Sequence, residues 1–229
     1  LFYILLGIIS AAVSIYFVKV FLFIDKSFDR LKKIPAYFKP AIGGLFVGVI
    51  GLWLPGVYGF TYKYIDSSLY NIAPFWMLLL LMIFKPIATG FTIGSGGNGG
   101  TFAPSLFTGA MLGGAFGQAI NYLFPEIGVS PGAYALVGMA AVVAGNTHAS
   151  LTALIMVFEL TNNYNIILPL MLTIIISATI SRYVLKGSLY TLKFKSQGQD
   201  FDIYGRKVSV LKSIPIDSVK EPIECFVEI

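Results

Sequence analysis

The sequence predicts an all-α polytopic membrane protein that contains re-entrant and broken helices. The 229 residues are 56% hydrophobic and only 12% charged, with a mean hydropathy of +0.80, whereas a soluble domain carries about 25% charged residues. The apolar residues form several separate runs, many of them shorter than the roughly 20 residues that cross a bilayer. One long uncharged stretch, residues 86–125, is interrupted by glycines. Such irregular backbone is tolerated in a membrane only where protein buries it or it lines a cavity.

The first predicted helix covers residues 1–30, and its far end leaves the membrane. Residues 1–18 carry no charge. The loop that follows is basic, opposed only by Asp25 and Asp29. Its positive residues are Lys26, Arg30, Lys32, Lys33 and Lys39. By the positive-inside rule this loop is cytoplasmic, so the first helix runs from outside to inside.

The next three segments differ in length and polarity. Residues 41–54 form a second apolar helix. Residues 58–70 are short and polar, so we expect them to be re-entrant or interfacial rather than to span. Residues 73–91 are long enough to span, but we expect Lys85 and Pro86 to interrupt that helix, because proline removes a backbone donor.

The remaining helices are also uneven in length, which favours a bundle of tilted and broken helices over simple parallel spans. They are predicted over residues 101–123, 131–144, 149–160 and 166–184, with a short helical stretch at 190–195.

Two sets of regularly spaced glycines indicate close helix contacts. Gly44 and Gly48 share one face of the second helix. Gly109, Gly113 and Gly117 form a similar face on a later one. Small residues four apart let two helix backbones approach closely in a membrane.

The glycine-dense stretch 94–100 leads directly into the helix predicted at Thr101. Pro104 fits its first turn, because the missing N–H would have no intrahelical partner there. The free amides and positive dipole end of this helix then lie in an uncharged membrane segment, where they can bind an anion without a cation. Packing alone would explain regular glycines but not these irregular ones. A phosphate-binding loop is rejected because Gly100 stands where that loop needs lysine.

The residues that close this stretch resemble a motif of the CLC chloride channels and chloride/proton antiporters. Gly100-Thr101-Phe102-Ala103-Pro104 is similar to the family's G-x-F-x-P motif. The resemblance continues in order through residues 105–110, 138–141, 154–161 and 189–190. An ordered series of this kind is far more specific than one short match.

The resemblance implies a CLC-type inverted-repeat fold, in which the anion path lies between two halves. This chain would be the C-terminal repeat and final helix, forming a transmembrane domain over residues 1–198. Residues 208–219 resemble the lead-in to CBS domains, so a cytoplasmic linker and the start of a CBS-domain region are expected over 199–229. Because Leu1 is not an initiator methionine, we expect the chain to be part of a longer protein whose N-terminal half completes the pore.

The resemblance also assigns an anion-binding site. Carried over by motif, the anion is held by the backbone amides of Thr101 and Phe102 and by the hydroxyl of Tyr190. A phenolic hydroxyl donates without carrying charge, so chloride can leave again. From the residues alone, Tyr190 would be an interfacial aromatic anchor. The supporting motif residues are Gly99, Gly100, Ala103 and Pro104.

The expected substrate is chloride and the expected surroundings are membrane lipid, in an integral protein of the cell membrane. The resemblance implies a homodimer formed through the helices at 149–160 and 166–184. We expect no enzymatic activity, no nucleic-acid partner and no metal or other cofactor, because His148 and Cys225 are each alone and the basic residues do not cluster with aromatics. The gating and proton glutamates of the family lie in the first half. Channel and antiporter, and selectivity among chloride, nitrate and fluoride, therefore stay open.

Two other function classes have some support in the sequence. Ser95 and His148 could form the dyad of an intramembrane serine protease, but Ile93 stands where a G-x-S-x-G nucleophile motif needs glycine. The chain could also be a membrane anchor for a function beyond its tail.

Among the remaining polar residues, Glu159 is interpreted as an acceptor for a neighbouring turn, and His148 as part of a helix cap. Lys85 either adds positive potential to the anion path or snorkels and pairs.

Overall fold

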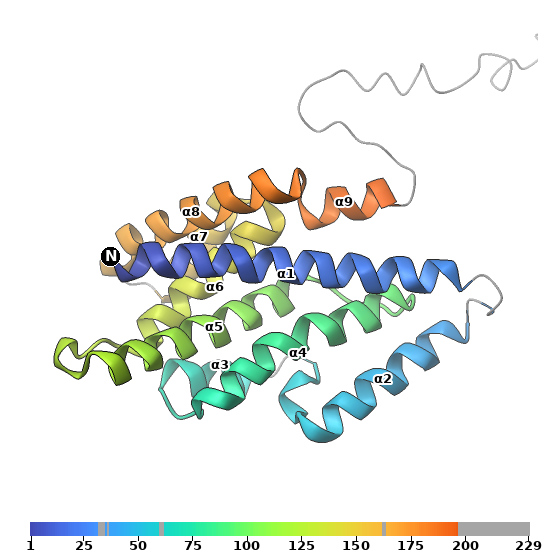
Figure 1. Cartoon of the computed structure of the whole chain (residues 1–229), viewed down its shortest axis with the longest axis horizontal. Helices are drawn as coiled ribbons and strands as arrows, with labels where there is room; N and C mark the ends of the chain where they lie inside the picture. The colour runs from blue at the N-terminus through green and yellow to red at the C-terminus, as the bar shows by residue number, and fades with distance from the viewer. Residues whose placement is uncertain (32–34, 36, 60–61, 162–163, 197–229) are drawn as a thin grey trace, which may run out of the picture.

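The structure, a computed structural model, is helical throughout the part that it describes (Figure 1). It describes residues 1–31, 35, 37–59, 62–161 and 164–196. The elements are α1 (Phe2–Arg30), α2 (Lys39–Trp53), η1 (Pro55–Val57), α3 (Tyr62–Leu69), α4 (Phe75–Gly94), α5 (Phe102–Leu123), η2 (Pro125–Ile127), α6 (Pro131–Thr147), α7 (Ser150–Thr161), η3 (Tyr164–Ile166), α8 (Ile167–Leu185) and α9 (Leu189–Ser196). The predicted all-α class is confirmed. The predicted linker and CBS-domain region at 199–229 lies outside the described residues.

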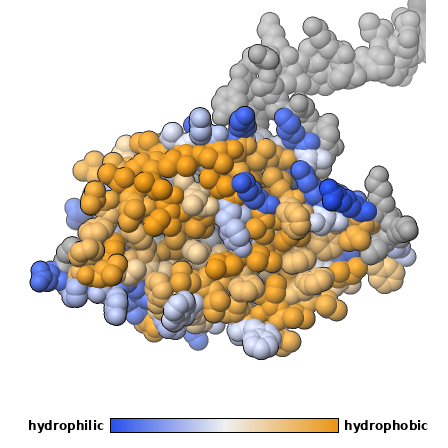
Figure 2. All heavy atoms as spheres, in the orientation of Figure 1, coloured by the Kyte–Doolittle hydropathy of each residue, from blue (hydrophilic) through white to orange (hydrophobic). Residues whose placement is uncertain are grey.

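Long and short helices are mixed, as the sequence predicts. Within the described ranges, three stretches are long and apolar enough to cross a membrane, namely Phe2–Arg30, Phe75–Gly94 and Tyr164–Ser196. Figure 2 shows hydrophobic side chains over most of one face, with hydrophilic residues gathered toward its edges. Many large apolar side chains are exposed, Leu52 and Trp53 of α2 among them. This surface is suited to lipid or to further protein rather than to water.

Helix α1 is the central element of the bundle. It runs the length of the molecule and packs against α4, α6 and α8 (Figure 1). Buried hydroxyls join these helices through backbone carbonyls: Ser14 donates to Val142 at 3.2 Å, and Ser177 donates to Ala141 at 2.7 Å. Small hydroxyl residues at helix crossings permit close approach while satisfying their own polar groups.

The glycine face predicted on α5 packs directly against the backbone of α6. A Cβ atom added at Gly109 or Gly113 would overlap backbone atoms of α6, at Gly138 and Tyr134 respectively. A Cβ at Gly117 would stand 2.6 Å from Cα of Pro131 at the start of α6. The predicted close-packing face is therefore confirmed, and the structure identifies α6 as its partner.

The prediction for Gly44 and Gly48 is wrong within the described structure. A Cβ added at either residue would have no neighbour within 4 Å. Gly43 is the closely packed residue instead, because a Cβ there would meet the carbonyl of Phe91 at 2.6 Å. The face of α2 that contacts α4 is thus displaced by one residue, since the phase of a helix is set by its neighbours and not by its glycine spacing alone.

The predicted interruption at Lys85 and Pro86 is also wrong, because α4 is one continuous helix with Pro86 inside it. The proline ring weakens the backbone bonding of the preceding turn. The Tyr16 hydroxyl of α1 donates to the carbonyl of Ile83 in that turn, at 3.2 Å. Neighbouring helices commonly re-satisfy backbone groups around a transmembrane proline in this way.

The short segment expected at 58–70 contains α3, which is too short to span a membrane. Its Ser68 hydroxyl donates to the carbonyl of Ala110 on α5 at 2.9 Å. A Cβ at Gly132 of α6 would overlap the carbonyl of Leu69. Helix α3 is therefore held against the middle of α5 and the start of α6.

Candidate anion site

The glycine-dense stretch begins by ending α4 rather than by forming a binding loop. Gly96 has a left-handed backbone (φ +94°), which glycine adopts without strain. The Gly97 N–H donates to the carbonyl of Thr92 at 3.0 Å and the Gly96 N–H donates to that of Ile93 at 3.1 Å. This pair of bonds is the Schellman termination of a helix. Two of the irregular glycines therefore have a structural role that the sequence analysis did not assign.

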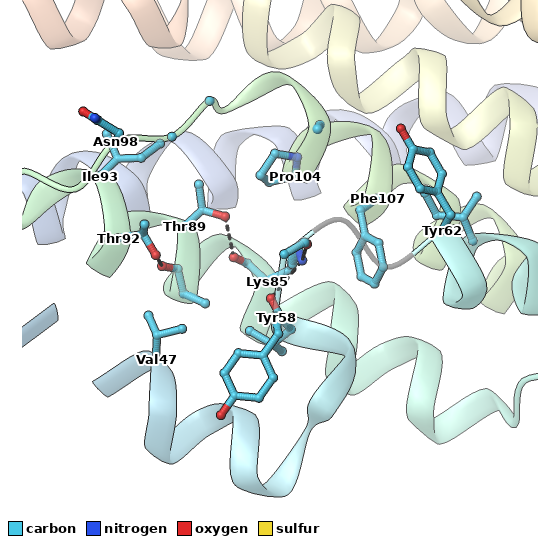
Figure 3. A pocket seen from close by; sticks show the side chains of 17 residues that line it. Val47, Tyr58, Tyr62, Lys85, Thr89, Thr92, Ile93, Asn98, Pro104 and Phe107 are labelled. Atoms are coloured by element: carbon cyan, nitrogen blue, oxygen red, sulfur yellow. Dashed lines mark hydrogen bonds between the residues drawn. The ribbon is translucent and has the colours of Figure 1, made fainter. Parts of the chain in front are cut away.

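The last glycines of the stretch line a cavity of about 280 Å³ between α2, α4 and α5. All four predicted supporting residues, Gly99, Gly100, Ala103 and Pro104, are part of its wall. Figure 3 shows side chains of these three helices around the same space. Among the described lining residues, none is Thr101, Phe102 or Tyr190. The supporting residues thus line this cavity, while the predicted anion ligands do not.

Helix α5 begins at Phe102, with Thr101 as its N-cap residue. The first bond of the helix runs from the Ser105 N–H to the Thr101 carbonyl, at 3.1 Å. Pro104 is the third helical residue, as the motif predicts. The Thr101 side chain makes no capping bond. The N–H groups of Phe102 and Ala103 are consequently donors without intrahelical partners.

The structure brings Tyr190 to this helix start from the far end of the chain. The Thr101 hydroxyl donates to the Tyr190 hydroxyl oxygen at 3.2 Å, across 89 residues of sequence. Because Tyr190 accepts in this bond, its own proton can be donated to a third group. Thr101 is buried, and Tyr190 is 43% exposed on α9. Two of the three predicted ligands therefore meet in space, and Phe102 follows Thr101 in the chain.

A buried polar network supports Thr101, and sequence reasoning missed it. The Ser105 hydroxyl donates to the Thr101 carbonyl at 2.7 Å. The Asn146 side-chain amide of α6 donates to the Ser105 hydroxyl oxygen at 2.8 Å. Ser105 and Asn146 are each only 1% exposed. The only signal in the sequence is the presence of polar residues inside otherwise apolar helices, which does not reveal their partners.

Lys85 is buried in the cavity wall, with its charge directed to backbone carbonyls. Its Nζ donates to the carbonyl of Val57 at 2.9 Å and to that of Gly59 at 2.7 Å. The ammonium also lies 4.6 Å from the centroid of the Phe107 ring, a cation–π contact. Lys85 therefore fastens the η1 segment to α4 and α5, and it does not snorkel.

The proposed protease dyad is not assembled. Ser95 is buried and its hydroxyl donates to the Thr92 carbonyl at 3.1 Å. His148 lies instead in the turn between α6 and α7, where its carbonyl accepts from Arg182 of α8 at 2.7 Å. No hydrogen bond recorded for the described residues joins Ser95 to His148. His148 was expected in the cap of the following helix, but it is the C-cap residue of α6, with a left-handed backbone (φ 60°).

Two further expectations concern Glu159 and metal ligands. Glu159 is exposed on α7, and the turn it was expected to serve includes residues outside the described ranges. Across the described part of the chain, no group of three or more His, Cys, Asp or Glu side chains is placed to hold a metal ion.

The fold and this helix start define a polytopic membrane protein in which a helix begins, with free amides, inside a stretch of 40 residues that carries no charged side chain, an arrangement typical of anion transport proteins. Residues 1–182 match the sequence model of the voltage gated chloride channel family. The chain belongs to this CLC family, and the resemblance drawn from its motifs is confirmed.

Two relatives and two solved structures illustrate the similarity. The chain is 40% identical to the chloride channel protein CLC-f of Arabidopsis thaliana over 183 residues, covering 74% of this chain and 23% of the relative. It is 35% identical to the H⁺/Cl⁻ exchange transporter ClcA of Yersinia pestis bv. Antiqua over 192 residues, covering 82% of this chain and 40% of the relative. The chain thus spans less than half the length of these relatives.

Among solved structures, a slow cyanobacterial Cl⁻/H⁺ antiporter superimposes with a TM-score of 0.77 at 27% identity, covering 85% of this chain and 46% of the other. A eukaryotic CLC transporter gives a TM-score of 0.72 at 24% identity, covering 86% and 35%, and this match shows the fold alone. The predicted CLC-type fold is confirmed by both.

Proposed function

We propose that this chain forms the C-terminal repeat of a CLC-type protein that moves chloride across a membrane. The observation that carries the proposal is the contact between Thr101 and Tyr190, which joins the start of α5 to α9 at 3.2 Å. An anion at this point would meet the free amides of the first helical turn and the proton of the Tyr190 hydroxyl. These donors are neutral, so they bind chloride without holding it too tightly for release.

The proposal covers both modes of transport. One of the relatives described above is named as a chloride channel and the other as an H⁺/Cl⁻ exchange transporter. A proton path and an outer gate would have to come from residues outside this chain. We therefore propose that an N-terminal half of the same protein completes the pore and decides between channel and antiporter, and also among chloride, nitrate and fluoride. No enzymatic step or further cofactor is part of the proposal.

We further propose a homodimer through the helices at 149–160 and 166–184. Large apolar side chains of α7 and α8 are exposed, including Leu151 at 70%, Leu168 at 79% and Ile175 at 58%. A second copy would cover this surface, while lipid would cover the remaining apolar sides. The basic end of α1 supports a cytoplasmic loop after that helix, with α9 and the tail of the protein on the same side of the cell membrane.

The Tyr190→Phe variant tests the site in the full-length protein that contains this segment. Removal of the hydroxyl deletes one donor to the anion, and a hydrogen bond to a charged group contributes about 1.5–3 kcal/mol. We expect roughly tenfold to hundredfold weaker chloride binding by isothermal titration calorimetry, and altered chloride efflux from liposomes.

Tyr183→Phe is the matched control, because it removes the same hydroxyl from a tyrosine that is 86% exposed on α8. It should bind chloride like the wild type. The proposal is wrong if wild-type protein neither binds nor moves chloride, or if Tyr190→Phe leaves the affinity at the wild-type value.

A further inference from the structure

Asp25 is a buried carboxylate of α1 that touches both segments leading to the candidate anion site. Only 7% of its side chain is exposed. Its main chain lies against the beginning of the glycine-dense stretch, because a Cβ at Gly94 would stand 3.0 Å from Cα of Asp25. Its carboxylate Oδ1 lies 3.6 Å from the Nζ atom of Lys193 on α9. One residue of α1 thus contacts the segment before α5 and also the helix that carries Tyr190.

Helix α9 is short and depends on α1 for its place (Figure 1). Leu189 is buried in a small apolar cluster with Phe17 and Phe21 of α1. Lys193 lies three residues after Tyr190 and places its ammonium 5.4 Å from the centroid of the Phe21 ring. Apolar contacts hold the helix to α1 but leave rotation and sliding open. The ion pair with Asp25 is a directed contact that opposes both movements, and it lies one turn after the bond between Tyr190 and Thr101.

The electrostatics favour a well-defined pair. A buried carboxylate is costly unless a cation or hydrogen-bond donors compensate it. The other oxygen of Asp25, Oδ2, is buried and has no hydrogen-bond partner among the described residues. Lys193 is therefore its principal compensating group, and α9 cannot move away without leaving this charge uncompensated.

We propose that Asp25 is a positioning residue of the anion site, which acts through Lys193 to hold the Tyr190 hydroxyl at the start of α5. The inference rests on the proposed chloride function and deepens it. It predicts that chloride affinity depends on the Asp25 carboxylate, although this group does not itself contact the anion. The dependence should disappear when Tyr190 lacks its hydroxyl.

The test is a mutant cycle in the full-length protein, with chloride affinity measured by isothermal titration calorimetry. We expect Asp25→Asn and Lys193→Met each to weaken chloride binding several-fold, and Lys193→Arg, which keeps the cation, to retain it. In a Tyr190→Phe background, Asp25→Asn should cause no further loss, because both changes act through the same hydroxyl. A merely structural role would lower affinity equally in both backgrounds.

Asp29→Asn is the matched control, because Asp29 is exposed one turn further along α1; it should bind chloride like the wild type. If Asp25→Asn fails to fold, Lys193→Met decides the question, because Lys193 is partly exposed and keeps its apolar stem as methionine. Unchanged affinity in Lys193→Met, or an equal loss in the Tyr190→Phe background, overturns the inference. A wild type that binds no chloride would overturn the proposed function instead.

Discussion

Gly113→Val should abolish the packed core of the protein. A Cβ at this position overlaps the backbone of α6 at Tyr134 and Ala135, so no side-chain rotation can relieve the clash. The two helices must separate, and Gly109 and Gly138, which pack backbone to backbone in the same contact, would lose their fit. Overpacking of a core costs about 1–3 kcal/mol and occasionally more. Here we expect the upper end of that range or beyond, because backbone is displaced.

The measurement is thermal unfolding and size-exclusion elution of the detergent-solubilised full-length protein. Gly44→Val is the control: it introduces the same residue into a helix, but a Cβ there meets nothing within 4 Å in this structure. We expect Gly44→Val to elute and melt near the wild type, and Gly113→Val to aggregate or to melt far below it. Equal melting of the two variants would show that the α5–α6 contact is looser than described.

Lys85→Met should strongly destabilise the protein. The substitution keeps an apolar stem but removes the donors to the carbonyls of Val57 and Gly59 and the charge beside the Phe107 ring. A buried acceptor left without a donor costs about 1–3 kcal/mol, and loss of the cation–π contact adds to this. We expect a total loss of about 3 kcal/mol. Lys85→Arg should lose less, since it retains the charge.

Thermal unfolding of the same protein measures this effect, with Lys63→Met as the control because Lys63 is exposed on α3. Lys63→Met should melt like the wild type. If Lys85→Met melted at the same temperature as Lys63→Met, Lys85 would not fasten η1 to the bundle. The burial of Lys85 in the cavity wall would then need another explanation.

Several features of the fold follow from local sequence. The close-packing face of α5 was predictable because Gly109, Gly113 and Gly117 repeat over three turns of one helix face, but the identity of its partner, α6, was not. The start of α5 was predictable because proline is favoured in a first helical turn and glycines seldom continue a membrane helix. The role proposed for Tyr190 came only from the family resemblance, since a lone tyrosine near a membrane edge is more often an anchor.

Other features depended on partners that are distant in the chain. Pro86 lies inside a continuous α4, and the Tyr16 hydroxyl of α1 donates to a carbonyl of the turn before it. Gly43 packs in place of Gly44 because α4 lies on that side of α2. Asp25 was counted as a loop charge that opposes the basic residues, but the structure buries it against α9.

The amino-acid sequence is sufficient to identify a helical membrane protein of the CLC family, with a helix start in an uncharged segment. Composition, run length and motif order are properties of the chain and need no partner. Three contacts become visible only in the folded chain: Thr101 with Tyr190, Lys85 with two backbone carbonyls, and Asp25 with Lys193. Polar groups inside a membrane bundle must find partners, and which partner each one finds is set by the packing of helices that are remote in sequence.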